Sequence, residues 1–229
     1  QVNGKKKMRK FLKRSLDTYL TSRTFESKRE NALMYNDGQG YIHYQKGSLI
    51  FYALSDYIGE KNLNKSLSKY VNKVAFQEPP YTTTIDLVNH VKEVTPDSLN
   101  YLIKDMFETI TLYQNRIVST NSKKLENGKY QVDIEFKVSK YRNDEKGKIF
   151  YGNDKRDSIS YKTEEMRKAE YSVFLSDYID IGIFGENEDE EEVELYLKKH
   201  KINSIHNKIS IVVDKEPIEV GVDPYNKLI

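Results

Sequence analysis

The hydrophobic pattern of this chain changes its period near residue 115, and this change limits the possible folds more than any other feature. Before that point, apolar residues recur at the three- and four-residue spacing of a buried helical face. After it, they alternate with polar residues, as in half-buried strands. We therefore expect a multidomain α and β protein, with an N-terminal α-helical subdomain over residues 1–114 and a C-terminal antiparallel β-sandwich over residues 115–229.

The first part contains five helical stripes. Gly59 is placed to end the second helix, and the pair Pro79-Pro80 should break the chain after the third. Thr95 followed by Pro96 predicts the N-cap and first turn of the last helix. The apolar stripes cover residues 8–20, 49–58, 63–74, 85–91 and 99–107.

The second part contains alternating segments at residues 130–138, 179–183, 195–197 and 209–213, each predicted to be a strand. Asn127-Gly128 is a hairpin-type turn signal just before the first of them. The nearly all-acidic run from Glu186 to Glu194 predicts a solvated loop between two strands. A calcium site is the alternative, but the run lacks the ligand spacing and the glycine of an EF-hand loop.

Composition excludes several classes of protein. Hydrophobic residues make up 38% of the chain, enough for a packed core, and no apolar run approaches the roughly 18–20 residues that span a bilayer. The net charge of +2 argues against a nucleic-acid partner. The absence of cysteine excludes disulfides and cysteine-ligated zinc. No apolar segment follows the basic residues of Gln1 to Lys7, so no signal peptide is expected here.

No complete catalytic set is visible in these residues. The chain contains no H-E-x-x-H, G-x-S-x-G or P-loop motif. The four histidines are far apart in sequence, and no pair has the spacing of helical metal ligands. We interpret three of them as surface residues: His90, His200 and His206.

The segment from Tyr41 to Gly47, at the start of an apolar helix, is the most unusual in the chain. A phenol donates a hydrogen bond without carrying charge at neutral pH, which suits stabilisation of a developing oxyanion. The alternative is a packed aromatic cluster, which composition alone favours because the chain has 18 tyrosines.

This segment resembles a stretch of the membrane alanine aminopeptidase family, whose members are zinc metallopeptidases. The resemblance implies that Tyr44 is the catalytic residue that stabilises the oxyanion, with Tyr41 as a backup. It also implies structural roles for Lys46, as a helix-end charge, and for Gly47, which would permit close helix packing. The matching residues are Tyr44-Gln45-Lys46-Gly47, Leu54, Ile58-Gly59-Glu60 and Tyr70, against Y-x-K-G…L…I-G-E…Y.

Three segments are similar to one bacterial branch of that family, in which an ABC-type transporter permease is fused to the peptidase domain. They are residues 41–48, residues 180–184 and the ending from Gly221 to Ile229. The resemblance implies a membrane-anchored parent, with this domain on the extracytoplasmic side and soluble by itself. It also implies that the C-terminal sandwich is fibronectin type III-like.

In that family the zinc ligands, two histidines and one glutamate, precede the Y-x-K-G element, and no histidine precedes His43 here. We therefore expect a fragment of a zinc aminopeptidase-like protein, inactive alone, whose partners are a peptide substrate and the upstream catalytic and permease segments. Zinc is then expected in the parent and not in this fragment. A non-catalytic domain of a transporter permease, which binds a cargo or partner, is the alternative. Plain structural domains are disfavoured, because three segments point to one family in order.

Overall fold

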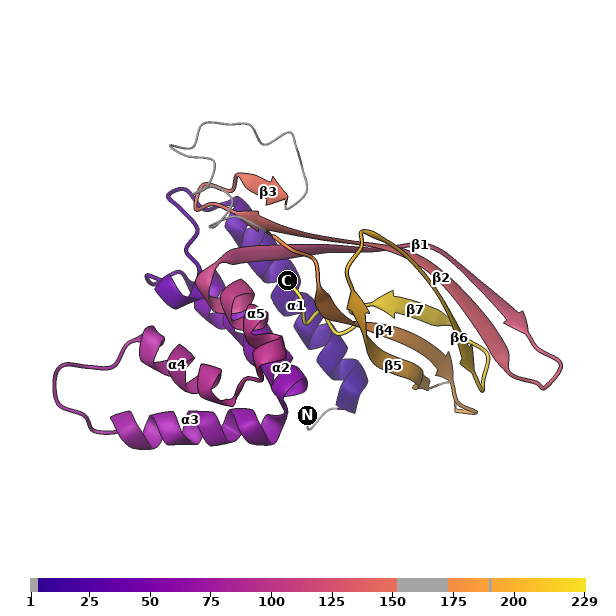
Figure 1. Ribbon diagram of the computed structural model, residues 1–229, viewed down its shortest axis with the longest axis horizontal. Helices are drawn as coiled ribbons and strands as arrows, with labels where there is room; N and C mark the ends of the chain where they lie inside the picture. Colours follow the sequence, from indigo (N-terminus) through magenta and orange to yellow (C-terminus); the bar gives the residue numbers. More distant parts are fainter. Residues whose placement is uncertain (1–3, 152–172, 190) are drawn as a thin grey trace. The chain divides into compact units, whose positions relative to one another are not determined.

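The computed structural model describes residues 4–151, 173–189 and 191–229, which form helices and two antiparallel sheets (Figure 1). The predicted mixture of α and β structure is therefore confirmed. The described chain divides into two compact units. The strand unit contains the described residues up to Lys10, Leu112–Tyr141 and those from Phe150 to Leu228. The helical unit contains Phe11–Thr111, Arg142–Ile149 and Ile229.

Helices occupy every stripe that the helical spacing predicts. The fifth stripe is divided, because a π-helical turn follows its short α-helix. The α-helices are α1 (Gly4–Thr24), α2 (Gly47–Ile58), α3 (Glu60–Val74), α4 (Thr84–Val94) and α5 (Asn100–Ile103). The 3-10 turns are η1 (Leu33–Tyr35) and η3 (Asp97–Leu99), and the π-helical turns are η2 (Tyr41–Lys46) and η4 (Lys104–Glu108).

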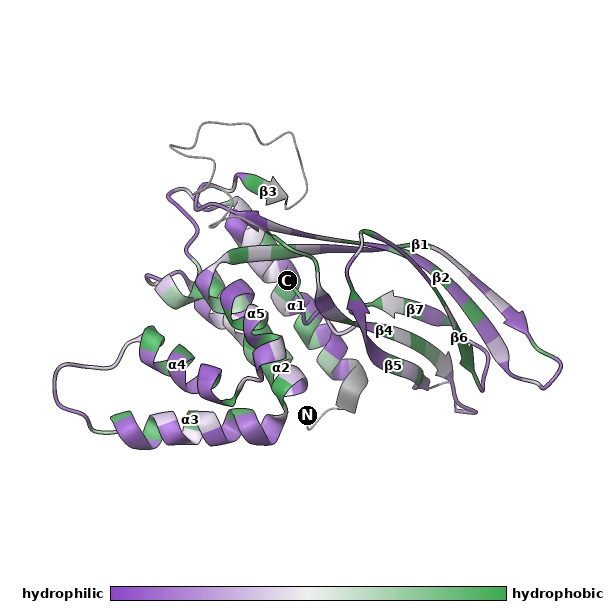
Figure 2. Cartoon of the chain, viewed as in Figure 1, coloured by the Kyte–Doolittle hydropathy of each residue, from purple (hydrophilic) through white to green (hydrophobic). Residues whose placement is uncertain are grey.

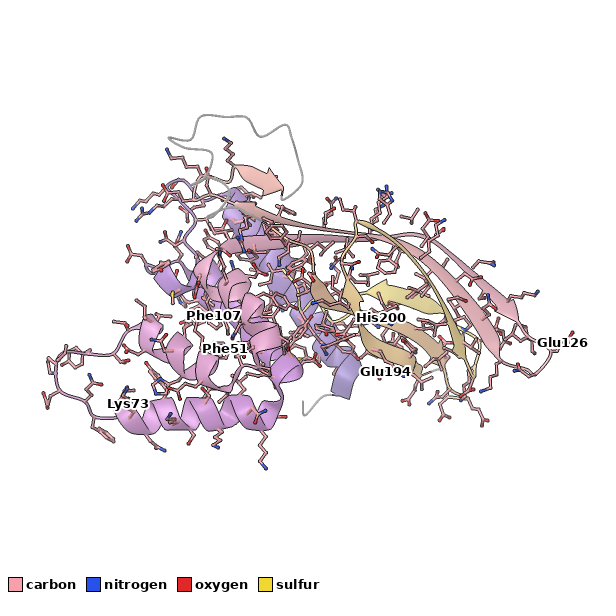
Figure 3. The ribbon with its side chains drawn as sticks, in the orientation of Figure 1. Phe51, Lys73, Phe107, Glu126, Glu194 and His200 are labelled. Atoms are coloured by element: carbon pink, nitrogen blue, oxygen red, sulfur yellow. The ribbon has the colours of Figure 1, made fainter. Side chains whose placement is uncertain are left out.

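Helix α2 provides the apolar centre of the helical unit. Its residues Leu49, Ile50 and Leu54 are fully buried, and its Phe51 ring meets Phe107 edge-on at 6.1 Å between centroids (Figure 3). Gly59 ends α2 with a φ of 87°, as predicted, since a left-handed backbone favours glycine. The predicted break at Pro79-Pro80 is also confirmed, because both prolines lie in the loop between α3 and α4.

The predicted N-cap at Thr95 is wrong. The Thr95 hydroxyl donates a hydrogen bond to the carbonyl of Val91 at 2.8 Å, so this side chain belongs to the end of α4. Pro96 lies at the N-cap position of η3 in its place, without a side-chain cap. The hydroxyl binds back to the preceding turn because Thr95 is buried against it.

The strands form two sheets. In the first sheet, β2 pairs with β1, β3 and β6; in the second, β4 lies between β5 and β7. Asn127-Gly128 forms the predicted turn between β1 and β2, with the Gly128 N–H donating to the Leu125 carbonyl at 3.0 Å. The strands are β1 (Ile110–Lys124), β2 (Tyr130–Asn143), β3 (Ile149–Tyr151), β4 (Asp177–Glu186), β5 (Glu192–Ile202), β6 (His206–Val213) and β7 (Glu219–Val222).

The alternating residues that predicted strands are mostly buried on one face. Ile179, Ile181 and Ile183 of β4 have no exposed surface, and the alternate residues of β2 from Val132 to Val138 are also buried. The acidic run forms a shorter loop than predicted, because β4 reaches Glu186 and β5 already begins at Glu192. Figure 2 shows hydrophilic residues along α3, with apolar residues between them. Among the described helices, none combines the length and the apolar character needed to cross a bilayer.

Candidate functional site

Tyr44 lies in the π-helical turn η2, which continues directly into α2. Its side chain is 71% exposed, and within the described chain its hydroxyl has no hydrogen-bond partner. The phenol is therefore not part of a packed core cluster. Single π-helical turns are rare and occur frequently at functional sites, because they re-aim the side chains of the helix that they interrupt.

His43 holds the Tyr44 ring from one side. The two ring centroids are 4.3 Å apart, with the planes tilted by 54°. His43 Nδ1 lies 2.9 Å from the side-chain amide nitrogen of Asn36. Because an amide nitrogen only donates, Nδ1 accepts this hydrogen bond. The Asn36 amide oxygen in turn accepts the backbone N–H of Gln39 at 3.2 Å, so the histidine is attached to the loop before the turn.

A buried polar network lies behind the turn. The Tyr19 hydroxyl donates to one oxygen of Glu30, and Arg23 donates to the other from Nε at 2.9 Å and Nη2 at 2.7 Å. Lys46 Nζ lies 3.5 Å from the Tyr19 hydroxyl oxygen. The network thus joins α1, the loop that follows it and the end of η2, and we call these four residues the Glu30 network.

Lys46 lies in the last turn of η2, as the interpretation of a helix-end charge expects, but it is buried, with only 1% of the residue exposed. Burial lowers the pKa of Lys46 to about 8; the nearby Arg23 lowers it further, and the Glu30 carboxylate opposes both. The same burial, together with Glu30, raises the pKa of Tyr19 well above its ordinary value. The Tyr19 phenol therefore stays protonated and remains a donor.

The Tyr41 side chain makes contacts with other residues of the helical unit. Its hydroxyl donates to Glu26 at 3.2 Å, and its ring stacks on Tyr19 with centroids 6.0 Å apart. Burial and the nearby carboxylates of Glu30 and Glu26 raise the pKa of Tyr41. Of the two phenols that the sequence singled out, Tyr41 is held by a carboxylate, whereas Tyr44 faces solvent.

Gly47 is not required for close helix packing. A Cβ atom at this position would lie 3.8 Å from the Ile42 carbonyl oxygen and 3.9 Å from the Leu33 side chain, which are ordinary contact distances. Its φ of −57° is also helical, so alanine could adopt it. The resemblance implied that Gly47 permits close helix packing, and this role is therefore wrong.

Two histidines differ from their interpretation as surface residues. His90 is buried on α4, with Nδ1 donating to the Asp86 carbonyl at 2.7 Å. His200 on β5 is half-buried, and its Nε2 lies 2.8 Å from the Tyr196 hydroxyl. Burial, and then Lys198, lower the pKa of His200. His206 is exposed, as expected.

The described residues do not form a zinc site. Over the described ranges, no three His, Cys, Asp or Glu side chains come together where they could hold one metal ion. This statement includes the described part of the acidic run.

The C-terminal ending forms a buried charge cluster that sequence reasoning missed. Lys227 Nζ donates to Asp180 of β4 at 2.6 Å. Asp223 accepts the backbone N–H groups of Lys227 at 3.0 Å and Leu228 at 2.8 Å, and burial raises its pKa to about 6. This cluster anchors the turn at residues 223–226 to β4 within the strand unit. Asp223, Pro224 and Tyr225 lie in this turn, which the Asn226 N–H closes by donating to the Asp223 carbonyl.

Comparison with known proteins does not place the chain in a family. No family model matches it, and no curated protein matches it either.

Proposed function

We propose that this chain is the C-terminal part of a zinc aminopeptidase-like protein, in which Tyr44 donates a hydrogen bond to the oxyanion that develops on the scissile carbonyl of a peptide. One observation carries the proposal: Tyr44 is exposed on a π-helical turn, and its hydroxyl is free of any hydrogen bond within the described residues. A free donor at an interrupted helix is available to a substrate, whereas a bonded one would first have to be released.

The surroundings of Tyr44 support this role. The His43 ring contacts its ring, and the buried Lys46 places the end of the same turn beside Tyr19 and Glu30. An oxyanion donor is effective when it is held in place before the reaction, so that no reorganisation is needed in the transition state. The proposal assigns the zinc ligands and the general-base glutamate to the parent, outside these 229 residues.

The resemblance to the permease-fused branch extends the proposal to architecture and location. The two sheets of the strand unit are proposed to pack as a fibronectin type III-like sandwich. The parent is proposed to be anchored in a bacterial membrane by permease segments, with this region on the extracytoplasmic side and a peptide as substrate. The segments at residues 180–184 and 221–229 support this assignment to the permease-fused branch. Both segments carry the resemblance, and both contribute residues to the charge cluster of the C-terminal ending.

The test is Tyr44→Phe in the full-length parent, assayed for release of N-terminal residues from peptides. Removing one oxyanion donor should lower kcat by about 10²–10³-fold with little change in KM, because the donor acts mainly in the transition state. Tyr35→Phe is the matched control, since Tyr35 is 61% exposed and also belongs to the helical unit. A kcat unchanged by Tyr44→Phe removes this residue from the mechanism.

A second candidate function is a non-catalytic domain of an ABC-type transporter permease that binds a cargo or a partner. Exposed apolar side chains of the strand unit favour it, among them Phe174 and Ile218. The upstream sequence of the same gene separates the two candidates. An intact H-E-x-x-H there, together with zinc-dependent peptide hydrolysis, supports the enzyme; a parent that lacks the motif supports the binding domain.

A further inference from the structure

The hairpin of α3 and α4 combines a row of lysines with an exposed apolar tip. The lysines lie on α3, and the apolar side chains lie at the end of α3, in the loop at residues 75–83 and at the start of α4. We call this surface the α3–α4 tip surface. Its members are Lys61, Lys65, Lys69, Lys73, Val71, Phe76, Tyr81 and Ile85.

The lysines recur at every fourth residue of α3. A helix rises about 1.5 Å per residue, so successive lysines lie about 6 Å apart along its axis. Helix α3 contains four lysines and only one acidic residue, Glu60, which gives it a net charge of +3. Lys69 pairs with Glu93 of α4. Within the described residues, the other three lysines have no salt-bridge partner; Lys73 is labelled in Figure 3.

The apolar tip is open to solvent. Phe76 is fully exposed, at 104% of its reference surface, and Tyr81 is 72% exposed. Phe76 also has a φ of 60°, a backbone conformation that is a genuine outlier for a bulky residue. A bulky side chain kept in an unfavourable backbone region, while it gains nothing from burial, indicates that exposure of the ring has a use of its own.

We propose that the α3–α4 tip surface docks on the surface of an anionic lipid bilayer. Charge complementarity selects this partner: lysines attract anionic headgroups, and their long stems let the charge remain at the headgroup level while the stem lies against apolar groups. The Phe76 and Tyr81 rings enter the boundary between headgroups and acyl chains, where aromatic residues are enriched.

Both parts of the surface are needed. A single weak signal gives only marginal membrane binding, and stable attachment takes an apolar insertion together with a basic patch. The attraction of the lysines is also screened by salt, so binding weakens as ionic strength rises. This inference does not depend on the function proposed for Tyr44, because it uses none of the residues around η2.

The experiment is co-sedimentation of the full chain with phosphatidylcholine vesicles that contain or lack phosphatidylglycerol. We expect binding to the anionic vesicles, little binding to the neutral ones, and release by salt. Two double variants, K61E/K65E and F76S/Y81S, should each weaken the apparent affinity by at least about tenfold. Because all four side chains are exposed, both variants should keep the circular dichroism spectrum of the wild type.

Matched controls come from the strand unit. K123E/K137E makes the same change of charge at exposed lysines, and Phe174→Ser removes another exposed aromatic ring. Both should bind anionic vesicles like the wild type. The proposal is overturned by a chain that does not sediment, by equal binding to both kinds of vesicle, or by hairpin variants that bind like the wild type. It is also overturned if the tip mediates self-association, detected as a dimer in sedimentation velocity that F76S/Y81S abolishes.

Discussion

Lys46 shows at the scale of one residue how a charge is kept inside the helical unit. Its ammonium group lies beside the Tyr19 phenol, which in turn donates to the carboxylate of Glu30. Arg23 supplies a second positive charge to that carboxylate. The Glu30 carboxylate therefore interacts with two cations in a region of low dielectric constant, so its loss should be costly.

Glu30→Ala should lower the free energy of unfolding by about 3 kcal/mol, because it removes the carboxylate that stabilises the buried ammonium group of Lys46 and binds Arg23. Urea denaturation followed by circular dichroism measures the change. Asp17→Ala breaks the exposed pair between Lys13 and Asp17 and serves as the control, with an expected cost below about 1 kcal/mol. Equal effects of the two substitutions would show that the Glu30 network does not support the fold.

The pKa of Lys46 predicts a pH dependence of stability. It is about 8 in the folded chain against an ordinary value of 10.5, so between these values the unfolded chain binds more protons. Stability should therefore rise with pH through this window, by about 1–2 kcal/mol between about pH 7.5 and about pH 9.5.

Lys46→Met should abolish that rise while it preserves the volume of the side chain. The comparison stops near pH 9.5, because the Tyr19 and Tyr41 phenols, whose folded pKa values are raised, act in the opposite direction above about pH 10. Parallel stability curves for wild type and variant over this range would mean that Lys46 keeps an ordinary pKa in the folded state.

At the scale of elements, the π-helical turn η2 places its neighbouring side chains on opposite sides. Lys46 points into the Glu30 network, whereas Tyr44, two residues earlier, faces solvent. The turn passes into α2 without a capping side chain, because Gly40 and Gly47, its flanking residues, already have helical backbone angles. The role of Tyr44 as an oxyanion donor stays a prediction.

Glycines in strands and helices should respond differently to a methyl group. A Cβ at Gly185 of β4 would lie 2.8 Å from the backbone oxygen of Glu216 and 2.9 Å from the Leu195 side chain. Gly185→Ala should therefore destabilise the strand unit by about 1–3 kcal/mol. Gly47→Ala meets only ordinary contacts and gains helix propensity, so it should be neutral or stabilising by up to about 1 kcal/mol.

Thermal and urea unfolding of the two alanine variants measures this contrast. Gly128→Ala is a further comparison, because a Cβ there meets no atom within 4 Å but the backbone has a φ of 81°. The stability of Gly128→Ala therefore reports the cost of backbone strain alone, without steric overlap. A Gly185→Ala variant as stable as wild type would show that the strand can move away from Glu216.

On the scale of the whole molecule, each unit is assembled from separate parts of the chain. The start of α1, up to Lys10, belongs with the strands, and residues 142–149 belong with the helices. Arg142 shows the consequence inside the helical unit: it donates to buried Asp105 at 2.8 Å from 37 residues away. Neither unit is therefore one continuous stretch of sequence.

Arg9 provides the corresponding test in the strand unit. Its guanidinium pairs with Glu192 at 2.9 Å and with Glu219, and it lies 4.5 Å from the centroid of the Phe184 ring. Arg9→Ala should destabilise the chain by about 1–3 kcal/mol, since charge-assisted bonds and packing are lost together.

Lys10→Ala, at an exposed neighbouring position, is the matched control and should change stability little. Chemical denaturation of both variants measures the difference. An Arg9→Ala chain as stable as the Lys10→Ala chain would mean that the first helical residues do not stabilise the strand unit.

Elements whose signal is local could be predicted from the residue pattern alone. The stripe of Leu49, Ile50 and Leu54 predicted α2, and the alternation of Ile179, Ile181 and Ile183 predicted β4, because burial of one face imposes its period on neighbouring residues. Gly59 predicted the end of α2, and Asn127-Gly128 predicted the turn before β2, because the backbone conformation at each place depends on one or two residues.

Which charged side chains are buried depends on the assembled fold and could not be predicted from the sequence. Nothing near Lys46 in the sequence indicates Tyr19 or Glu30 as its neighbours, and nothing near Lys227 indicates Asp180. These residues meet across long stretches of chain, and their burial depends on a counter-charge that only the assembled fold supplies. Strand β1 was also not predicted from the sequence. Most of this strand is exposed, so its pairing with β2, and not a hydrophobic pattern, makes it a strand.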